Sequence, residues 1–384
     1  MSDALSSFSF PTRIEFGAGA IRSLPDWLPS FGMRRPLVVT DPGFAGTPVF
    51  DGIRRRLDES GTSWQLYSGV HGNPIEADVR EACEVFRATD CDGVIGIGGG
   101  SPLDVGKAVR LLIKRPDMNL ADFDWQDDWT ELVPFVAVPT TSGTGSEVGR
   151  SAVITPTGSK RKAVLFHPEL LAVLAILDPE LTVGLPPGLT AATGVDALTH
   201  CIESYTSPVF HPLCDGIALE GVRLIRAALP MVMEDPNDLS ARGRLQVAAA
   251  MGGIAFQKDL GAAHSMAHPL STHHGLHHGL ANALCLPTVM AFNAQRSPGC
   301  YRQVALALGE DVVTATDAVA DEVAVKAVTG LLRSVGIPEG LHSQGIEESA
   351  LALLAEEAFA DPCHQTNPVP VSTEDFLSLY QSAL

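Results

Sequence analysis

The chain has 384 residues, of which 45% are hydrophobic and 18% are charged, and its formal net charge is −19 at pH 7. A chain of this length and composition can form two globular domains with a large buried core, and it does not resemble a disordered chain. The negative net charge argues against nucleic acid and anionic membranes as partners, because both bind basic surfaces.

Strand-like and helix-like segments alternate in the first half of the chain. We expect strands over residues 35–41, 64–70, 93–100 and 135–141, and helices over 49–60, 77–89 and 102–113. This alternation favours a parallel sheet with helices packed on its faces.

The pattern changes after residue 147. Short extended segments are expected over 152–155, 162–166 and 171–177, and the paired prolines of GLPPGL (184–189) indicate a hinge or domain junction. From Thr190 onward almost every segment is helical in character. We therefore expect an α/β domain over residues 1–185 and an all-helical domain over residues 186–384.

Cysteine usage and the N-terminal sequence favour a cytoplasmic location. The seven cysteines are scattered and form no C-x-x-C motif, which fits reduced thiols rather than a disulfide framework. The segment MSDALSSFSFPTRIEFG has no basic region followed by an apolar run, so we expect no secretory signal. The longest apolar stretches are shorter than a membrane span.

A glycine-rich turn, IGIGGGSPLDVGK (95–107), lies where a strand is expected to run into a helix. Backbone N–H groups and the helix dipole favour an anion at such a junction. The residues fit neither the G-x-G-x-x-G fingerprint nor the P-loop pattern, so a tight turn without a ligand is the alternative. Two other features favour a dinucleotide site. Asp41 ends the first strand, where a carboxylate can bind a ribose, and PTTSGTGSE (139–147) follows another strand.

Histidines are concentrated in one segment, GAAHSMAHPLSTHHGLHHGLANA (261–283). His264 and His268 are four residues apart, as are Asp196 and His200 upstream, so a helix places each pair on one face. We expect Pro269 to interrupt its helix. An oxygen ligand with several imidazoles suits a divalent ion such as Zn²⁺ or Fe²⁺.

The alternative to a metal site is that Asp196 and His200 form a hydrogen-bonded pair in the protein core. The segment contains six histidines, and they cannot all be ligands of one metal ion. Adjacent histidines point in different directions on a regular backbone. Some histidines therefore serve elsewhere or face solvent.

Four motifs occur in order along the chain: GGGSPLDVGKA, PTTSGTGSEV, DPELTVGLPPGLTAATGVDALTHCIESY and HSMAHPL…HHGLANALCLP. Together they resemble the iron-dependent, group III alcohol dehydrogenases. The resemblance runs from RIEFGAG near the start to CHQTNP near the end. It implies an N-terminal dinucleotide-binding α/β domain and an all-α C-terminal metal-binding domain, the architecture shared with dehydroquinate synthase.

The resemblance assigns roles to individual residues. Four of them match the metal ligands, namely Asp196, His200, His264 and His278. His268 matches the catalytic histidine near the nicotinamide. The cofactor-binding positions are Asp41, Asn73, Gly98, Gly99, Gly100, Ser101, Thr140, Thr141, Thr144, Ser151 and Lys162. Asp41 matches the position associated with NAD rather than NADP. No inherited role falls on His273, His274 or His277.

The implied reaction is hydride transfer between an alcohol and NAD. The metal, Fe²⁺ or Zn²⁺, lowers the pKa of the alcohol, and a proton leaves through His268. The family also implies a homodimer, with contacts at sheet or loop edges near the N-terminus.

The substrate prediction depends on Arg150, which follows PTTSGTGSEV where many family members have uncharged residues. An arginine inside a cleft requires an anionic or carbonyl partner. Together with CHQTNP, this detail is most similar to the branch that oxidises 4-hydroxybutyrate to succinic semialdehyde. We expect Arg150, with His167 or His364, to bind a substrate carboxylate. The alternatives are a salt bridge to Glu147, or solvent exposure in a general primary-alcohol dehydrogenase.

Other classes share parts of this pattern. Sugar-phosphate cyclases and glycerol-1-phosphate dehydrogenases combine NAD with a metal in the same architecture. The cyclases need a basic phosphate-binding set, and few Lys or Arg residues lie near the histidines. Maleylacetate reductases share the fold but lack the metal. The intact set of one aspartate and three histidines argues against assigning this chain to that class. A third class is a non-enzymatic metal buffer or sensor. That function would leave the segments that resemble a dinucleotide site unexplained.

Overall fold

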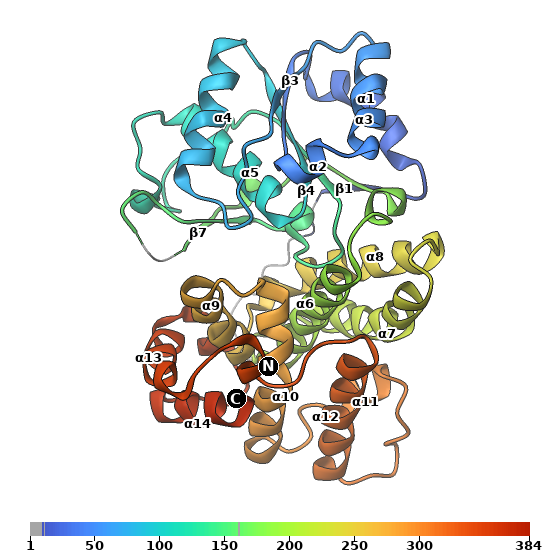
Figure 1. Ribbon diagram of the computed structural model, residues 1–384, viewed down its shortest axis with the longest axis vertical. Coiled ribbons are helices and arrows are strands. Elements are labelled where there is room, and N and C mark those ends of the chain that lie inside the picture. The colour runs from blue at the N-terminus through green and yellow to red at the C-terminus, as the bar shows by residue number, and fades with distance from the viewer. Residues whose placement is uncertain (1–9, 11, 160–161) are drawn as a thin grey trace. The chain divides into compact units, whose positions relative to one another are not determined.

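The computed structural model describes residues 10, 12–159 and 162–384. The chain separates into two compact units (Figure 1). An α/β unit contains Phe10–Thr141 and Gly145–Gly184. A helical unit contains Leu185–Leu384 together with Ser142–Thr144.

The α/β unit is built on a six-stranded parallel sheet with strand order β1-β8-β5-β4-β2-β3. Its strands are β1 (Arg13–Phe16), β2 (Pro36–Val39), β3 (Gln65–Tyr67), β4 (Gly93–Gly98), β5 (Phe135–Pro139) and β8 (Leu174–Leu177). The predicted strands are confirmed, with slightly shorter bounds. Every residue of β2, β4, β5 and β8 is buried, as expected for inner strands covered on both faces.

The edge strand β1 was not predicted from the sequence. Its residues RIEF are mostly exposed and carry two charges, so they show neither a buried run nor clear alternation. Pairing with β8, in register from Arg13↔Leu174 to Phe16↔Leu177, is what makes this segment a strand.

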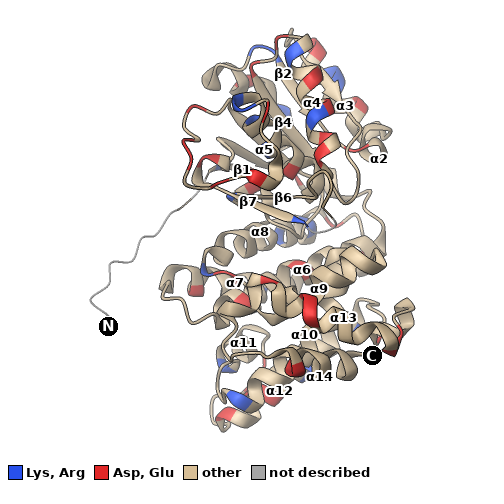
Figure 2. Cartoon of the chain, turned by 90° about the vertical axis from the view of Figure 1, so that its left-hand side faces the viewer, with Lys and Arg blue, Asp and Glu red and all other residues tan. Residues whose placement is uncertain are grey.

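Helices cover both faces of the sheet. They are α1 (Leu24–Trp27), α2 (Pro42–Ala45), α3 (Pro48–Glu59), α4 (Glu76–Ala88) and α5 (Gly100–Lys114). Alternate residues of a strand point to opposite faces. Val94 and Phe135 accordingly belong to one apolar cluster with α4 and α5, and Ile95 and Val136 belong to another with α1 and α3. The predicted helices are confirmed, and charged side chains are frequent on α3 (Figure 2).

A two-stranded antiparallel hairpin follows β5 in the chain. It pairs β6 (Ser151–Ile154) with β7 (Ala163–Phe166), which confirms the extended segments expected over 152–155 and 162–166.

The helical unit begins after Gly184, within the predicted GLPPGL junction. Its α-helices are α6 (Pro187–Thr206), α7 (Pro212–Glu234), α8 (Leu239–Ala255), α9 (Ala262–His274), α10 (His278–Arg296), α11 (Arg302–Ala307), α12 (Asp317–Ser334), α13 (Leu351–Ala360) and α14 (Thr373–Ala383). One apolar core joins side chains from these helices. In the part of the chain that the structure describes, no helix has the length and apolarity needed to cross a bilayer.

The predicted break at Pro269 was wrong. Helix α9 continues through Pro269 to His274 and ends at Gly275, which adopts φ +67°. Proline removes one i→i−4 hydrogen bond, a loss of about 3 kcal/mol in an isolated helix. Both Pro269 and most of α9 are buried, so tertiary packing maintains the helix despite that loss.

Candidate metal centre and dinucleotide-binding residues

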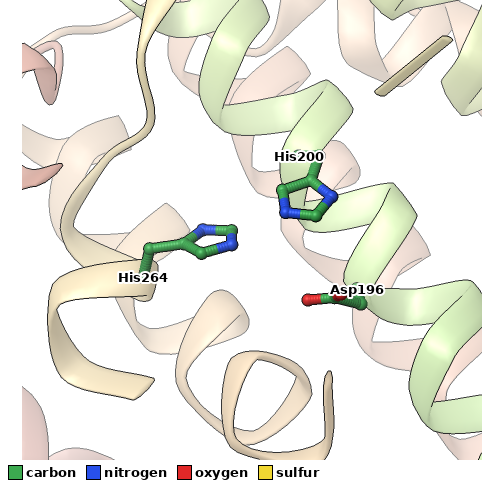
Figure 3. A group of neighbouring side chains, drawn as sticks. All are labelled: Asp196, His200 and His264. Atoms are coloured by element: carbon green, nitrogen blue, oxygen red, sulfur yellow. The ribbon is translucent and has the colours of Figure 1, made fainter. Parts of the chain in front are cut away.

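Helix α6 carries two of the four predicted metal ligands. Asp196 and His200 lie one turn apart on the buried face of this helix, and the side chain of His264 points toward them from α9 (Figure 3). One ligand atom of each residue lies within 4.8 Å of the others. The i,i+4 spacing therefore brings the two α6 side chains together as expected.

The fourth predicted ligand, His278, is the first residue of α10. Its Nε2 atom lies 3.7 Å from Oδ1 of Asp196, and its ring centroid lies 5.4 Å from that of His264. The structure thus brings all four predicted ligands together from three helices.

The donor set fits a divalent metal ion. His200 is buried in this cluster, and its Nδ1 atom has no hydrogen-bond partner, so protein groups alone do not satisfy the ring. Burial lowers the pKa of His200 to about 4, so the imidazole is neutral at pH 7. Burial would raise the pKa of Asp196, but the neighbouring His200, His278 and His264 and the hydrogen bond from Asn282 hold it at about 2. Neutral imidazoles and an ionised carboxylate are the ligand forms that Fe²⁺ and Zn²⁺ bind.

Asn282 is part of this cluster and was not predicted. Its Nδ2 atom lies 2.8 Å from Oδ1 of Asp196, 3.1 Å from Nε2 of His264 and 3.2 Å from Nε2 of His278. Asn282 follows His278 by four residues on α10, so helical spacing alone could have identified it.

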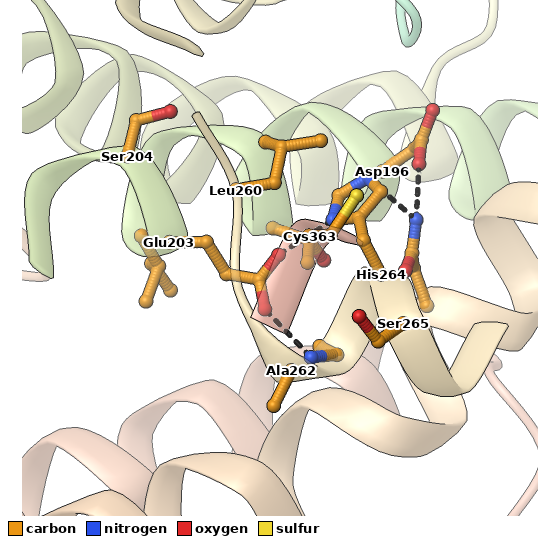
Figure 4. Close-up of polar contacts among 12 residues, drawn as sticks. Asp196, Glu203, Ser204, Leu260, Ala262, His264, Ser265 and Cys363 are labelled. Carbon is orange, nitrogen blue, oxygen red and sulfur yellow. Dashed lines mark hydrogen bonds and ion pairs between the residues drawn. The ribbon is translucent and has the colours of Figure 1, made fainter. Parts of the chain in front are cut away.

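Glu203 was also missed. Its Oε2 atom lies 2.6 Å from Nδ1 of His264, and its Oε1 atom accepts a 2.7 Å hydrogen bond from the backbone N–H of Ala263. Figure 4 shows this carboxylate between α6 and the first turn of α9. Glu203 continues the face of α6 that carries Asp196 and His200, at i+7 from the aspartate, which is the signal that could have found it.

The predicted catalytic histidine, His268, contacts a carboxylate of its own. Its Nδ1 atom lies 2.7 Å from Oδ2 of Asp361, and its ring stacks on that of His278 at 5.3 Å. Asp361 also accepts hydrogen bonds from the Ser265 hydroxyl and the Cys363 backbone. Burial would raise the pKa of Asp361, but the hydrogen bond with His268 and the charge of that histidine lower it well below its ordinary value. Nothing in the local sequence indicated this pair.

The three histidines without an inherited role are exposed. His273 contacts Glu357 through its Nε2 atom at 2.7 Å, while His274 ends α9 and His277 precedes α10.

The glycine turn of the α/β unit lies at the carboxyl end of β4. Gly98 has φ +150°, and a Cβ atom there would lie 2.6 Å from Pro102, so only glycine fits. Asp41 and Thr141 lie near this turn. A Cβ atom at Gly98 would lie 3.3 Å from Oδ2 of Asp41, and one at Gly99 would lie 3.4 Å from Cγ2 of Thr141. These residues follow the neighbouring strands β2 and β5. The start of α5 is thus surrounded by predicted cofactor residues.

Other predicted cofactor residues contact each other or nearby backbone. Nζ of Lys162 donates to Oδ1 of Asn73 at 2.9 Å, and the Ser101 hydroxyl donates to the carbonyl of Gly72 at 2.8 Å. The Thr140 N–H donates to the carbonyl of Gly98 at 2.8 Å. Thr144 belongs to the helical unit rather than to the α/β unit.

A buried network ties α5 to the segment PTTSGTGSE. Nζ of Lys107 donates to the Ser146 hydroxyl and to the carbonyl of Ser151, both at 2.8 Å. The Ser146 hydroxyl donates to Asp104 at 2.6 Å. The predicted cofactor residue Ser151 therefore uses its carbonyl in this network. Burial lowers the pKa of Lys107 to about 8, and sequence reasoning did not identify the network.

The three predicted substrate residues are not all in one unit. Arg150 and His167 are adjacent across the β6–β7 hairpin, where the His167 N–H donates to the Arg150 carbonyl at 3.0 Å. The Arg150 guanidinium lies 5.3 Å from the ring centroid of Phe166. His364 lies in the helical unit and contacts the carbonyl of Phe359 at 3.0 Å through its Nε2 atom.

Comparisons with known proteins cover both units. Residues 11–179 match the model of the iron-containing alcohol dehydrogenases, and residues 190–384 match that of the C-terminal part of the Fe-containing alcohol dehydrogenase family. The chain is 33% identical to the NAD-dependent methanol dehydrogenase of Bacillus methanolicus over 99% of this chain and 100% of that protein. It is 36% identical to the 4-hydroxybutyrate dehydrogenase of Cupriavidus necator over 97% and 98% of the two chains.

A solved structure of 1,3-propanediol oxidoreductase superimposes with a TM-score of 0.96 at 33% identity, covering 99% of this chain and 100% of that one. The family models and this solved structure match both the α/β unit and the helical unit. This is the family that the four motifs predicted. The chain therefore belongs to the iron-containing alcohol dehydrogenase family and is an NAD-dependent oxidoreductase.

Proposed function

We propose that the protein interconverts an alcohol and its aldehyde, with iron held by Asp196, His200, His264 and His278. The observation that carries this proposal is the convergence of these four side chains from α6, α9 and α10 on one buried site. A bound divalent iron supplies Lewis acidity, which lowers the pKa of an alcohol hydroxyl.

The protein supplies orientation and proton transfer. In this proposal NAD binds at the carboxyl ends of β2, β4 and β5, within the region 1–185, and the region 186–384 holds the metal and the reacting alcohol group of the substrate. The carboxylate of Asp41 accepts hydrogen bonds from the ribose hydroxyls of NAD and repels the 2′-phosphate of NADP. His268, held by Asp361, accepts the proton that the alcohol loses.

We further propose an ω-hydroxy acid such as 4-hydroxybutyrate as the substrate, with Arg150 binding its carboxylate. One relative is named for that substrate, while two others are named for methanol and 1,3-propanediol, which carry no charge. Burial lowers the pKa of His167, and its Nδ1 atom caps a short helix, so it is neutral at pH 7. His364 is engaged with Phe359. Arg150 is therefore the best anion-binding candidate of the three.

The experiment compares NADH oxidation with succinic semialdehyde and with butanal, using enzyme purified anaerobically and reloaded with Fe²⁺. We expect the semialdehyde to be preferred, and Arg150→Met to raise KM for the semialdehyde by about 10- to 100-fold with little change for butanal. Arg115→Met is the matched control, because Arg115 also stacks on an aromatic ring, at 4.5 Å from Trp129. Equal effects of Arg150→Met on both substrates would exclude an anion pocket and favour a general primary-alcohol dehydrogenase.

We also propose a homodimer. The place of β1 at the edge of the sheet supports this, because Phe16 on that strand is 53% exposed. Light scattering coupled to gel filtration tests the mass, and Phe16→Lys is expected to shift it toward the monomer.

A further inference from the structure

We infer that Glu203 is a positioning residue that fixes the ring orientation and tautomer of His264 for metal binding. The inference rests on the proposed ligand set, in which His264 is a ligand. It concerns a residue of α6 that touches none of the reacting atoms.

The first observation is how the carboxylate of Glu203 is used. Oε2 lies 2.6 Å from Nδ1 of His264, and Oε1 accepts the N–H of Ala263 at 2.7 Å. Both oxygens are therefore engaged by the first turn of α9, in a site where Glu203 is 4% exposed and His264 is 1% exposed. An ionised carboxylate only accepts hydrogen bonds, so the imidazole hydrogen of His264 lies on Nδ1.

The contact on the opposite side of the ring agrees with this assignment. Nε2 of His264 lies 3.1 Å from Nδ2 of Asn282, and an amide nitrogen can donate but not accept. An Nε2 atom that carries an electron pair suits this contact, and the ring points toward Asp196 and His200 (Figures 3 and 4). Donation from Nδ1 to a carboxylate orients a ligating imidazole and raises its basicity.

The backbone is shaped to allow this contact. A Cβ atom on Gly261, the residue before α9, would lie 2.8 Å from Oε1 of Glu203. Glycine at this position lets the chain pass close to the carboxylate. The next N–H, that of Ala262, donates to Oδ1 of Asn367 at 3.3 Å. Helix α9 thus begins against Glu203, and His264 projects from its first turn.

A second carboxylate–histidine pair in the same unit provides a control. Glu357 contacts Nε2 of His273 at 2.7 Å, and His273 is in neither the proposed ligand set nor the proposed proton-transfer pair. Comparison of the two pairs therefore separates support of a metal ligand from the loss of any carboxylate–histidine contact.

The test measures the Kd for Co²⁺ of the metal-free full-length protein by titration of the cobalt absorption bands. Glu203→Gln is expected to raise the Kd by about 10- to 100-fold, whereas Glu357→Gln leaves it unchanged. His264→Ala is expected to abolish high-affinity binding. Thermal unfolding of each metal-free variant shows whether the folded fraction is the same as in the wild type.

The outcomes separate the inference from the ligand set. If Glu203→Gln binds Co²⁺ as tightly as the wild type while His264→Ala does not bind, the role of Glu203 is overturned and the ligand set stands. If His264→Ala also binds normally, the ligand set itself is wrong. Should Glu203→Gln fail to fold, ¹⁵N-histidine NMR of the zinc-loaded wild type decides, because zinc on Nδ1 of His264 would overturn the inference and zinc on Nε2 with a hydrogen on Nδ1 supports it.

Discussion

His268 and Asp361 are separated by 93 positions in the sequence, yet Nδ1 of the histidine lies 2.7 Å from Oδ2 of the aspartate. The ring of His268 also stacks on that of His278, with the two ring centroids 5.3 Å apart. Asp361 is itself fixed by the Ser265 hydroxyl. A carboxylate in this arrangement selects the tautomer of the imidazole that can accept a proton.

Asp361→Asn is expected to lower kcat by about 10²-fold, because an amide can donate to Nδ1 and favour the wrong tautomer. KM for NAD and the metal content should be unchanged. Steady-state NADH production with a saturating alcohol measures kcat, and mass spectrometry of the metal gives the content. A loss of kcat that follows a loss of metal would contradict the proton-transfer role.

Lys107→Met is expected to lower the free energy of unfolding of the α/β unit by about 3–5 kcal/mol. The substitution leaves the carboxylate of Asp104 without its buried cation, and it removes two hydrogen bonds to Ser146 and Ser151. Urea unfolding followed by near-UV circular dichroism measures the change in midpoint. The double variant Asp104→Asn/Lys107→Met should recover part of the loss, and no recovery would mean that the charge pair is not the cause.

Glu147→Gln is expected to change the pH dependence of stability. Burial raises the pKa of Glu147 from 4.5 to about 7 in the folded protein. The carboxyl group of Glu147 therefore ionises at a lower pH in the unfolded chain than in the folded protein. As the pH rises from 4.5 to 7, the free energy of unfolding of the wild type falls by about 3 kcal/mol. The glutamine variant lacks this loss, so its stability relative to the wild type should be higher at pH 8 than at pH 5. A stability difference that does not vary with pH would contradict the raised pKa.

Gly279→Ala is expected to destabilise the helical unit by a few kcal/mol. A Cβ atom at Gly279 would lie 2.3 Å from the carbonyl oxygen of Ala192 and 3.1 Å from Cβ of Asp196, so α6 and α10 must separate. Gly330→Ala in α12 is the control, because nothing lies within 4 Å of its built Cβ, and it should stabilise by about 0.5–1 kcal/mol. Calorimetry measures both variants, and equal effects would show that the close contact does not limit packing.

The sequence by itself determined the features that depend on short spacing. Buried apolar runs identified β4 and β5, and alternating strands and helices identified the parallel sheet. The i,i+4 spacing placed Asp196 and His200 on one helix face, and the order of four motifs identified the family. Each of these signals lies within one element or its immediate neighbours, where backbone geometry fixes which residues share a face.

Only the tertiary structure decided the contacts between distant elements. Strand β1 exists because it pairs with β8 about 160 residues away, and α9 continues through Pro269 because the helix is buried. Glu203 and Asp361 take their places beside His264 and His268 through the packing of α6, α9 and the segment before residue 362. Such contacts depend on how whole helices pack against one another, and no local period in the sequence encodes that packing.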